Sequence, residues 1–462
     1  MATKDDRLIE LFKKITAVHY LTDYSSIDFI YPPHFIWDEF NQEKFSKFKN
    51  KFSSGNYALY AHFPFCQSKC KFCRQFSLAV KDSRLYREYT NLLIQELRLY
   101  TKMINIHSLI NVYCGGGTPT LFSLDTFFEA LHKYVKIDRI AQINVESSPE
   151  SLNYRKLKML KKWGISRLLI GLQSLDPKVL KLIRRPQHKL YFKKIFYWAK
   201  EVGIPVVNFE LVAGLPGQTL KSFLKDLETI IELKPESMHI YGYMNVPATL
   251  FYKEGYRASA EEKILQDQML AEGERILQEA NYIYRRDDYC LDNESTLRNQ
   301  VIAIPDYFRH FKVLGSISLG LSAIGSLTLN NGYLLKTINT MDYQRYKKNL
   351  QQGELPIGKE FLLNRDERER RFIIRAYRDG ILDAERINRF EKRYNSEIDY
   401  LKRQGKIKIE SLGKNIKILF SADNALIHSK IFYSPKVLKK CQKVIKERYS
   451  DINLKNVLGM AY

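Results

Sequence analysis

Three cysteines in one short loop are the residues of this sequence best suited to chemistry. Cys66, Cys70 and Cys73 lie within eight residues, although the 462-residue chain has only six cysteines. Thiolates are soft ligands that bind zinc or iron–sulfur clusters, and a structural zinc site normally fills four positions. Here no fourth ligand is evident, and the nearest further cysteine is Cys114. A four-iron cluster held by three cysteines leaves one iron open to a substrate or cofactor, and this interpretation is favoured over three unrelated buried thiols.

The composition indicates a reduced globular protein with a strongly basic surface. Hydrophobic residues make up 45% and aromatic residues 13%, which is enough for a substantial core. We see no membrane-spanning run and no secretory signal, and six cysteines are too few for a disulfide scaffold, so we expect a cytoplasmic protein. The net charge of +23 fits a solvated basic face, RNA, an acidic protein partner or a carboxylate-rich substrate. Because the common RNA-binding signatures are missing, we do not expect nucleic acid to be a partner.

Short β-rich runs alternate with amphipathic stretches over the central part of the chain. Ser83–Ile104, for example, carries apolar residues at helical spacing. This alternation indicates parallel βα units, so we expect an α/β fold with a partial (β/α)6 barrel, a doubly wound sheet being the alternative. The six predicted strands are Asn56–Phe63, Leu109–Gly116, Ala141–Ser148, Ser166–Ser174, Pro205–Gly214 and Ser237–Asn245.

The pattern changes on both sides of this region, which predicts three parts. Residues 1–54 have the pattern of an N-terminal helical arm, residues 55–300 that of the barrel, and residues 301–462 that of a C-terminal domain. In the last part, Asn364–Tyr394 predicts two successive helices and Gly405–Ser421 predicts a hairpin. This outline is typical of an α+β winged-helix-like module, to which we assign a packing or substrate-lid role.

Five motifs lie at the C-terminal ends of predicted strands, where α/β barrels build their active sites. They are Tyr60–Cys66 (YAHFPFC), Cys114–Thr120 (CGGGTPT), Glu146–Pro149 (ESSP), Gly171–Ser174 (GLQS) and Ala213–Thr219 (AGLPGQT). With the C-x₃-C-x₂-C loop they resemble the radical S-adenosylmethionine (SAM) superfamily. Their order and spacing are similar to those of the oxygen-independent coproporphyrinogen III oxidase (HemN-like) family. The resemblance spans most of the chain and is strongest between Asn56 and Thr219.

The resemblance implies a [4Fe–4S] cluster on Cys66, Cys70 and Cys73, with SAM bound at its open iron. It further implies reductive cleavage of SAM to a 5′-deoxyadenosyl radical, which abstracts hydrogen from a small organic substrate such as a tetrapyrrole. An acidic protein such as flavodoxin or ferredoxin would donate the electron. The positions that match SAM or cluster contacts in the family are Tyr60, Phe72, Gly115, Gly116, Gly117, Thr118, Glu146, Gln173, Arg185 and Glu210.

The residue types at these positions suit the implied roles. Glycines let a backbone approach a ligand closely, and the three glycines match the segment that lies against the methionyl end of SAM. Glu146, Gln173 and Arg185 match contacts to the ribose, amino and carboxylate groups, while a surface arginine is the alternative for Arg185. Phe72 matches an aromatic residue near the adenine, and Tyr60 matches a tyrosine beside the cluster.

The sequence also departs from the oxidases of that family. They usually carry a fourth cysteine where this chain has Gln75, and an aspartate where it has Glu210. In place of their RYTSYP-type and NFQGYTT-type stretches, we find Asp28–Pro33 (DFIYPP) and Tyr307–Leu314 (YFRHFKVL). These departures concern the regions where substrate and a second SAM would bind.

Three functions therefore stay open. The first is the oxidase or a related tetrapyrrole-modifying enzyme, in which basic residues pair with substrate propionates. The second is one-carbon transfer from a second SAM, giving C-methylation or cyclopropanation. The third is a non-catalytic haem chaperone. The histidines that could hold haem include His62, His188, His239 and His310.

Overall fold

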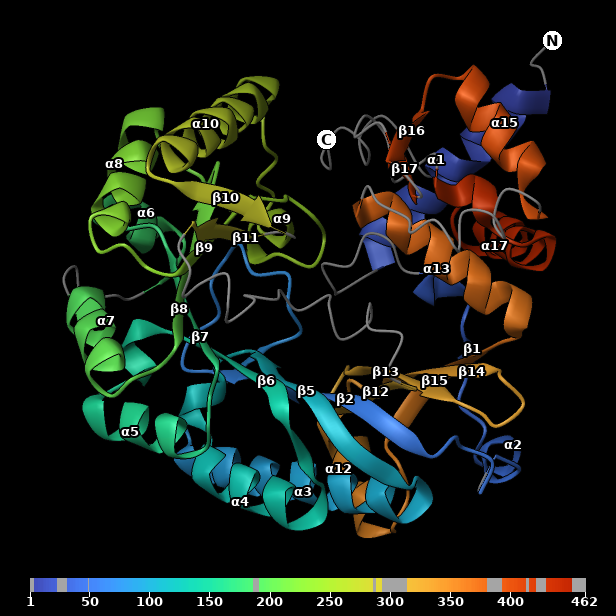
Figure 1. The fold of residues 1–462 in the computed structure, drawn as a ribbon, viewed down its shortest axis with the longest axis horizontal. Coiled ribbons are helices and arrows are strands. Elements are labelled where there is room, and N and C mark those ends of the chain that lie inside the picture. The colour runs from blue at the N-terminus through green and yellow to red at the C-terminus, as the bar shows by residue number, and fades with distance from the viewer. Residues whose placement is uncertain are drawn as a thin grey trace.

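One curved sheet organises the part of the chain that the structure describes. The computed structural model describes residues 4–22, 31–48, 50–185, 191–285, 288–292, 314–379, 393–412, 415–420 and 429–450. Within them, a sheet of 13 strands curves through the molecule and carries helices on its outer side (Figure 1). No helix in these ranges is both long and apolar enough to cross a lipid bilayer.

Six parallel strands follow one another across this sheet in chain order. They are β2 (Gly55–Phe63), β5 (Ile106–Gly116), β6 (Ile137–Ser147), β7 (Arg167–Gln173), β8 (Val206–Ala213) and β9 (Ser237–Gly242). Right-handed crossovers without a reversal of strand order place every connecting helix on one face, so the sheet curls into a partial barrel. The predicted partial barrel is confirmed. The doubly wound alternative is wrong, because that fold reverses its strand order.

The amphipathic stretch predicted at Ser83–Ile104 is a helix in the structure. Helix α3 (Ser83–Met103) starts after Asp82, whose carboxylate accepts a hydrogen bond from the Arg84 backbone N–H at 2.9 Å. Its apolar residues, Leu93 and Leu97 among them, are fully buried against the strands. The other helices of this layer are α4 (Leu124–Tyr134), α5 (Tyr154–Lys162), α6 (Pro177–Leu182), α7 (Tyr191–Glu201), α8 (Leu220–Ile231) and α10 (Ala260–Glu279).

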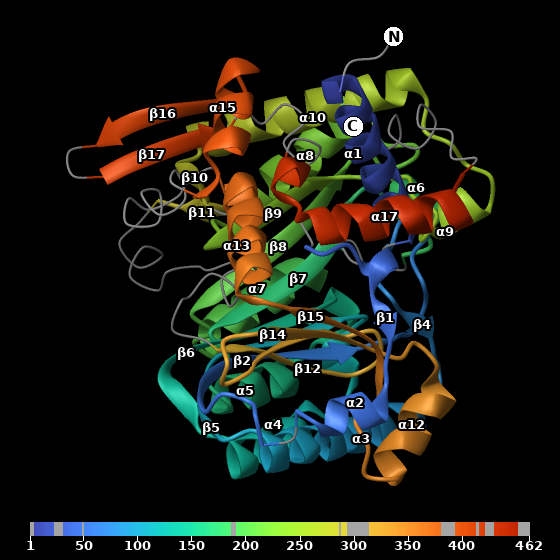
Figure 2. The same cartoon turned by 90° about the vertical axis from the view of Figure 1, so that its right-hand side faces the viewer.

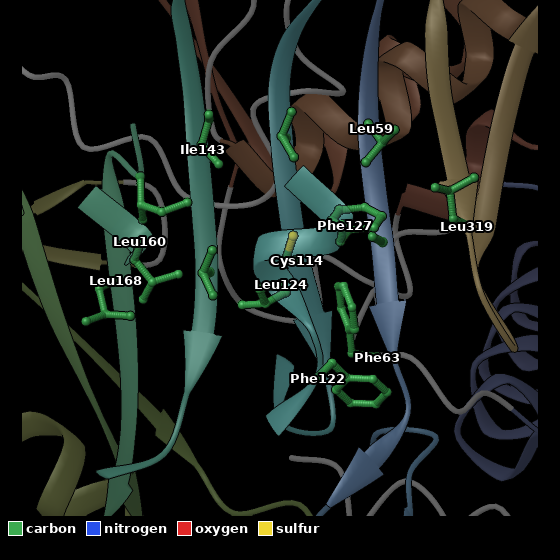
Figure 3. Packing of buried hydrophobic residues seen from close by; sticks show 14 of the residues in the cluster. Leu59, Phe63, Cys114, Phe122, Leu124, Phe127, Ile143, Leu160, Leu168 and Leu319 are labelled. Atoms are coloured by element: carbon green, nitrogen blue, oxygen red, sulfur yellow. The ribbon is translucent and has the colours of Figure 1, made fainter. Parts of the chain in front are cut away.

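The three cysteines outside the loop are core residues. Cys114 points from β5 toward α4 and lies beside Leu124 and Phe127 (Figure 3). Cys290 and Cys441 are also buried, and none of the three forms a disulfide. A free cysteine in such surroundings behaves as a small apolar side chain.

The sheet continues beyond the barrel strands at both sides. Strand β12 (Gly315–Leu319) pairs in parallel with β2, so a segment far along the chain lies next to the first barrel strand. The strands beyond it are β13 (Ile324–Thr328), β14 (Leu334–Asn339), β15 (Ile357–Leu363) and β1 (Asp38–Glu39). Beyond β9, the sheet ends with β11 (Asp288–Leu291) and β10 (Tyr282–Arg285).

The two terminal regions share a second hydrophobic core. Helix α1 (Lys4–Thr22) packs against α17 (Pro435–Arg448), as both views show (Figures 1 and 2). The Ser434 backbone N–H donates to the Tyr31 hydroxyl at 3.3 Å, and Lys440 pairs with Asp38 at 2.6 Å. The other elements of this region are α13 (Arg365–Asp379), α15 (Asn395–Arg403), β16 (Ile407–Leu412) and β17 (Asn415–Phe420). The hairpin is confirmed, whereas the second helix predicted before Tyr394 falls mostly outside the described residues.

A buried carboxylate ties the barrel to the strands that follow it. Glu96 of α3 is fully buried and accepts hydrogen bonds from Gly320 N–H (2.8 Å), Asn339 Nδ2 (2.6 Å) and the Tyr346 hydroxyl (2.6 Å). Each partner lies more than 200 residues further along the chain. Burial raises the pKa of Glu96 to about 7, although the three donors oppose that rise.

We expect Glu96→Gln to lower the melting temperature. The glutamine amide would place an N–H donor where a carboxylate oxygen of Glu96 now accepts hydrogen bonds from other donors. The cost should be about 1–3 kcal/mol of folding free energy. In the folded protein the pKa of Glu96 is about 7, above its ordinary value of 4.5. The contribution of Glu96 to the free energy of folding is therefore fully present below pH 4.5 and is lost as the pH rises through about 7. The advantage of the wild type over the variant should therefore shrink between pH 5 and pH 8, as thermal melts can measure.

Glu88→Gln is the matched control on the same helix. Glu88 is half-exposed and pairs with Lys347, so its loss should change the melting temperature little. Equal melting of Glu96→Gln and wild type across this pH range would contradict the role assigned to Glu96.

Candidate cofactor site

The cysteine loop follows β2 directly and is closed at its base by a short ladder. Strands β3 (Phe65–Cys66) and β4 (Leu78–Ala79) pair in parallel, and the Val80 N–H donates to the Cys66 carbonyl at 2.8 Å. All three loop thiols are half-buried and free. They lie close enough to interact electrostatically: burial raises the pKa of Cys66 to about 12, and the other two thiols add to this rise.

The chemistry of these donors suits an iron–sulfur cluster. Among the described residues, no three His, Cys, Asp or Glu side chains converge on a point that could hold one metal ion. A multinuclear cluster does not require such convergence, because each of its irons takes a separate thiolate. As soft donors, three thiolates from one loop are ligands of the kind that iron–sulfur clusters take.

The loop is anchored on its outer side by backbone hydrogen bonds. The Lys71 N–H donates to the Ile183 carbonyl at 3.0 Å, and the Phe251 N–H of α9 (Leu250–Lys253) donates to the Lys71 carbonyl at 3.1 Å. Phe72, predicted to lie near an adenine, is buried in an apolar cluster. Its neighbours in that cluster include Val179, Leu180, Ile183, Val212, Leu215, Tyr243 and Phe251.

The glycine segment at the end of β5 lies directly against the loop. Gly117 N–H donates to the Phe63 carbonyl at 2.7 Å, and a Cβ on Gly117 would lie 2.8 Å from the Phe65 carbonyl and 3.0 Å from Cys66 Sγ. The Thr118 hydroxyl donates to Cys66 Sγ at 3.4 Å. Only glycine allows this approach, so the segment forms a cradle beside the thiols that a side chain would fill.

Gly116 joins the glycine segment to the next strand. Its N–H donates to Glu146 Oε2 at 2.9 Å, and its φ of +113° is a conformation that L residues rarely adopt. A Cβ on Gly115 would lie 3.0 Å from Glu146. The three glycines and Glu146, predicted as one site from separate motifs, thus lie together.

Three more of the predicted residues gather around Gly171 of β7. A Cβ there would lie 2.5 Å from Gln173 Nε2, 3.3 Å from Arg185 Nη2 and 3.3 Å from Glu210 Oε2. Gln173 has a φ of +71° and accepts a hydrogen bond from the Tyr241 hydroxyl at 3.0 Å. Such a backbone conformation in a non-glycine residue is uncommon and is often found at functional sites.

Arg185 connects the residues around Gly171 to the thiols of the cysteine loop. Its guanidinium donates to the Gly171 carbonyl and to Cys70 Sγ at 3.5 Å. Its Nε is buried and has no hydrogen-bond partner in the described part of the chain. The alternative of an unrelated surface arginine is therefore wrong, and the free donor suits an anionic group of a bound cofactor.

Two carboxylates, Glu146 of β6 and Glu210 of β8, lie close enough to interact electrostatically. Glu146 accepts from the Tyr113 hydroxyl at 2.7 Å, and its pKa is raised by burial and by the nearby charge of Glu210. Such a pair favours a bound cation or hydrogen-bond donor between its members. It lies at the same end of the barrel as Arg185, so opposite charges border the site.

Tyr60 and His62 form a support behind the loop. Tyr60 stacks on Tyr113 and donates its hydroxyl proton to His62 Nδ1 at 2.8 Å. The other ring nitrogen, Nε2, donates to the Phe76 carbonyl at 2.8 Å, just past the last loop cysteine. Burial lowers the pKa of His62 to about 4, so the ring is neutral at pH 7. His62 lies within the motif YAHFPFC but was not among the residues predicted to contact SAM or the cluster, so the structure adds it as a functional candidate.

The same observation bears on the histidines considered as haem ligands. Both ring nitrogens of His62 are engaged within the protein. His239 lies 3.4 Å from Asp288 Oδ1 through its Nδ1 atom. His188 and His310 fall outside the described residues.

Sequence reasoning missed a polar layer deeper in the barrel. Arg167 and Asp288 form an ion pair of 2.7 Å, both almost fully buried, and Asn208 donates to Asp288 at 3.3 Å. These residues belong to β7, β8 and β11, and no sequence spacing relates them. A polar interior differs from the branched apolar layers that usually fill such barrels.

The chain is similar to several known proteins. The Radical SAM superfamily model matches residues 60–230. The haem chaperone HemW of Buchnera aphidicola subsp. Schizaphis graminum is 28% identical over 361 residues, covering 76% of this chain and 90% of that protein. The oxygen-independent coproporphyrinogen III oxidase of Helicobacter pylori is 28% identical over 365 residues, covering 75% and 78%.

A solved structure shares the fold. Coproporphyrinogen III oxidase (HemN) from Escherichia coli superimposes with a TM-score of 0.72, at 21% sequence identity, over 89% of this chain and 96% of that chain. The predicted resemblance is confirmed: residues 60–230 match the Radical SAM superfamily, and the fold is similar to that of HemN.

We expect His62→Ala to lower the amount of cluster that the protein retains, because the loop loses its anchor at Phe76. Iron and sulfide content and visible absorbance after anaerobic reconstitution would measure this loss, which we expect to be several-fold. His107→Ala is the control: that exposed histidine bonds Ser54 far from the loop in sequence. Full cluster content in His62→Ala would contradict the anchoring role.

Proposed function

From the radical SAM domain that this chain carries, we propose that the protein is an enzyme that cleaves SAM reductively and abstracts hydrogen from a small organic substrate. Cys66, Cys70 and Cys73 would hold a [4Fe–4S] cluster. The observation that carries the proposal is the convergence of Arg185 on both Cys70 and Gly171, which joins the thiol loop to the polar strand ends. When bound, such a cluster supplies the electron that splits SAM into methionine and a 5′-deoxyadenosyl radical.

The chain's own residues bind and orient SAM in this proposal. The Gly115–Gly117 backbone, which packs directly against Cys66 at Gly117, would lie along the methionyl end. Arg185 offers its unpartnered Nε to the carboxylate, and Glu146 and Glu210 accept from amino or hydroxyl donors. Gln173, held by Tyr241, and Thr118, beside Cys66, complete the polar lining. Phe72 contributes to the apolar wall and Tyr60 supports the loop through His62.

A tetrapyrrole is the substrate class we favour. Relatives named oxygen-independent coproporphyrinogen III oxidase match three quarters of the chain, and the net charge of +23 suits a substrate with several carboxylates. One-carbon transfer from a second SAM is the alternative, because Gln75 and Glu210 depart from the oxidase pattern.

Haem chaperoning is the second candidate function. A relative named as a haem chaperone is matched over 90% of its length. In the described residues, however, His62 has both ring nitrogens engaged, which does not favour it as a haem ligand.

One anaerobic assay distinguishes the three. Reconstituted protein with SAM and dithionite should release 5′-deoxyadenosine, and carbon dioxide should follow when coproporphyrinogen is added. Release of S-adenosylhomocysteine alongside 5′-deoxyadenosine would favour one-carbon transfer. Stoichiometric haem binding without SAM cleavage would favour the chaperone and would falsify the enzymatic proposal.

We expect Cys66→Ala, Cys70→Ala and Cys73→Ala each to abolish the cluster's visible absorbance and all SAM cleavage, because each removes one ligand. Cys114→Ala is the matched control: it removes a buried thiol from the core beside α4 and should keep most of both signals. Loss of the cluster in Cys114→Ala without loss of folding, monitored by circular dichroism, would require a different ligand set.

We also propose that an acidic protein such as flavodoxin or ferredoxin donates the electron. The charge of +23 would attract such a partner, so flavodoxin-driven SAM cleavage should slow steeply between about 0.05 and 0.3 M salt. Dithionite-driven cleavage serves as the control and should change little. If the rate of SAM cleavage depended equally on salt with both reductants, the proposal that the basic surface attracts the electron donor would be contradicted.

A further inference from the structure

Arg74 is a cation of the cysteine loop whose partner is not an anion. It follows Cys73 directly, is half-buried, and donates from Nη1 to the sulfur of Met244 at 2.6 Å. A thioether is a weak acceptor, whereas a guanidinium carries five donors in a planar fork. In the described part of the chain no carboxylate pairs with Arg74.

The neighbouring cations differ from Arg74 in this respect. Lys71 and Arg184 both pair with Glu254, at 2.6 and 3.2 Å. Lys69 donates to the Ser77 carbonyl at 3.0 Å, and Arg185 donates to the Gly171 carbonyl. Each of these four cations has an oxygen acceptor. Among the cations in and next to the loop, Arg74 therefore differs in having a sulfur atom as its acceptor in the described part of the chain.

Arg74 also lies on the inner side of the loop. Met244 follows the C-terminal end of β9, which is the end of the barrel where Gly171 and Gln173 lie. Arg74 is close to the half-buried Tyr241 as well: burial and Glu210 raise the pKa of that tyrosine well above its usual value, and Arg74 opposes the rise. Its guanidinium therefore faces the candidate site.

We propose that Arg74 binds a carboxylate of the substrate beside the cysteine loop. This inference rests on the proposed function and adds a specificity-determining residue to it. A guanidinium binds a carboxylate through two parallel hydrogen bonds. Partial burial strengthens this ion pair relative to one that is fully exposed to solvent. A carboxylate held next to Cys73 would place the adjoining carbon atoms of the substrate near the SAM site.

Because the argument concerns substrate charge, equilibrium binding tests it without turnover. The probes are coproporphyrin III, a stable tetracarboxylate, and its tetramethyl ester, whose carboxyl groups carry no charge. The protein is the reconstituted full chain, and fluorescence quenching of the porphyrin reports the Kd. The variants are Arg74→Met, which keeps an unbranched side chain without charge, and Arg74→Lys, which keeps charge without the planar fork.

Arg184→Met is the matched control, because it removes one positive charge close to the loop from a residue that already has a carboxylate partner. We expect Arg74→Met to weaken binding of the tetra-acid about tenfold and to leave binding of the ester unchanged. Arg74→Lys should lie between wild type and Arg74→Met, and Arg184→Met should stay within about twofold of wild type. Iron content and SAM cleavage without porphyrin should be unchanged in Arg184→Met, and iron content is measured for each Arg74 variant so that binding is compared between proteins with equal cluster content.

Three outcomes would overturn the inference. One is equal weakening by Arg74→Met and Arg184→Met, which would indicate a general effect of surface charge. Another is equal weakening of acid and ester binding by Arg74→Met, which would indicate a packing role. The third is a wild type that binds neither probe. Failure of the proposed function is a separate result, since it would appear as absence of SAM cleavage by the wild type in the assay without porphyrin.

Discussion

The close packing of Gly117 against the cysteine loop is the contact on which the candidate site depends. Its backbone bonds the end of β2, and the space that a side chain would take is occupied by Phe65 and Cys66. The ends of β2 and β5 and the cysteine loop between these strands are therefore in direct contact through their backbones. This contact fixes where the thiols lie relative to the strand ends, because neither segment can shift without a clash.

Charged groups of both signs lie at the candidate site. Glu146 and Glu210 are carboxylates close enough to interact, and Arg185 brings positive charge to Gly171 and the loop. In the proposed function, a zwitterionic ligand such as the methionyl group of SAM would find acceptors for its amino group and a donor for its carboxylate among these residues. Partial burial strengthens both interactions relative to those in water. The raised pKa of Glu146 is a consequence of the same arrangement, since burial and a second carboxylate both disfavour its ionised form.

Support for the site comes from segments distant in sequence. His62 bonds the loop at Phe76, and its ring occupies the space that Gly116 leaves open. Behind this region, β12 joins the sheet beside β2, and Glu96 fastens the turn after β12 to helix α3. The chain beyond residue 314 thus completes the wall that carries the loop. A barrel with fewer parallel strands than a closed one gains rigidity from this added sheet.

The sequence by itself determined the six parallel strands and suggested most members of the candidate site. Hydrophobic periodicity set the six parallel strands within a few residues, because alternation of buried strands and amphipathic helices is a local property. The resemblance to the radical SAM superfamily, carried by motifs at strand ends, predicted that the glycines, Glu146, Gln173 and Arg185 share one site, and parallel strands bring such residues to one edge of the sheet. Only the tertiary structure decided which polar atoms find partners. Glu96, the pair of Arg167 and Asp288, and the contact of Arg74 with Met244 join residues that no spacing relates, because long-range packing alone determines which side chains become buried together.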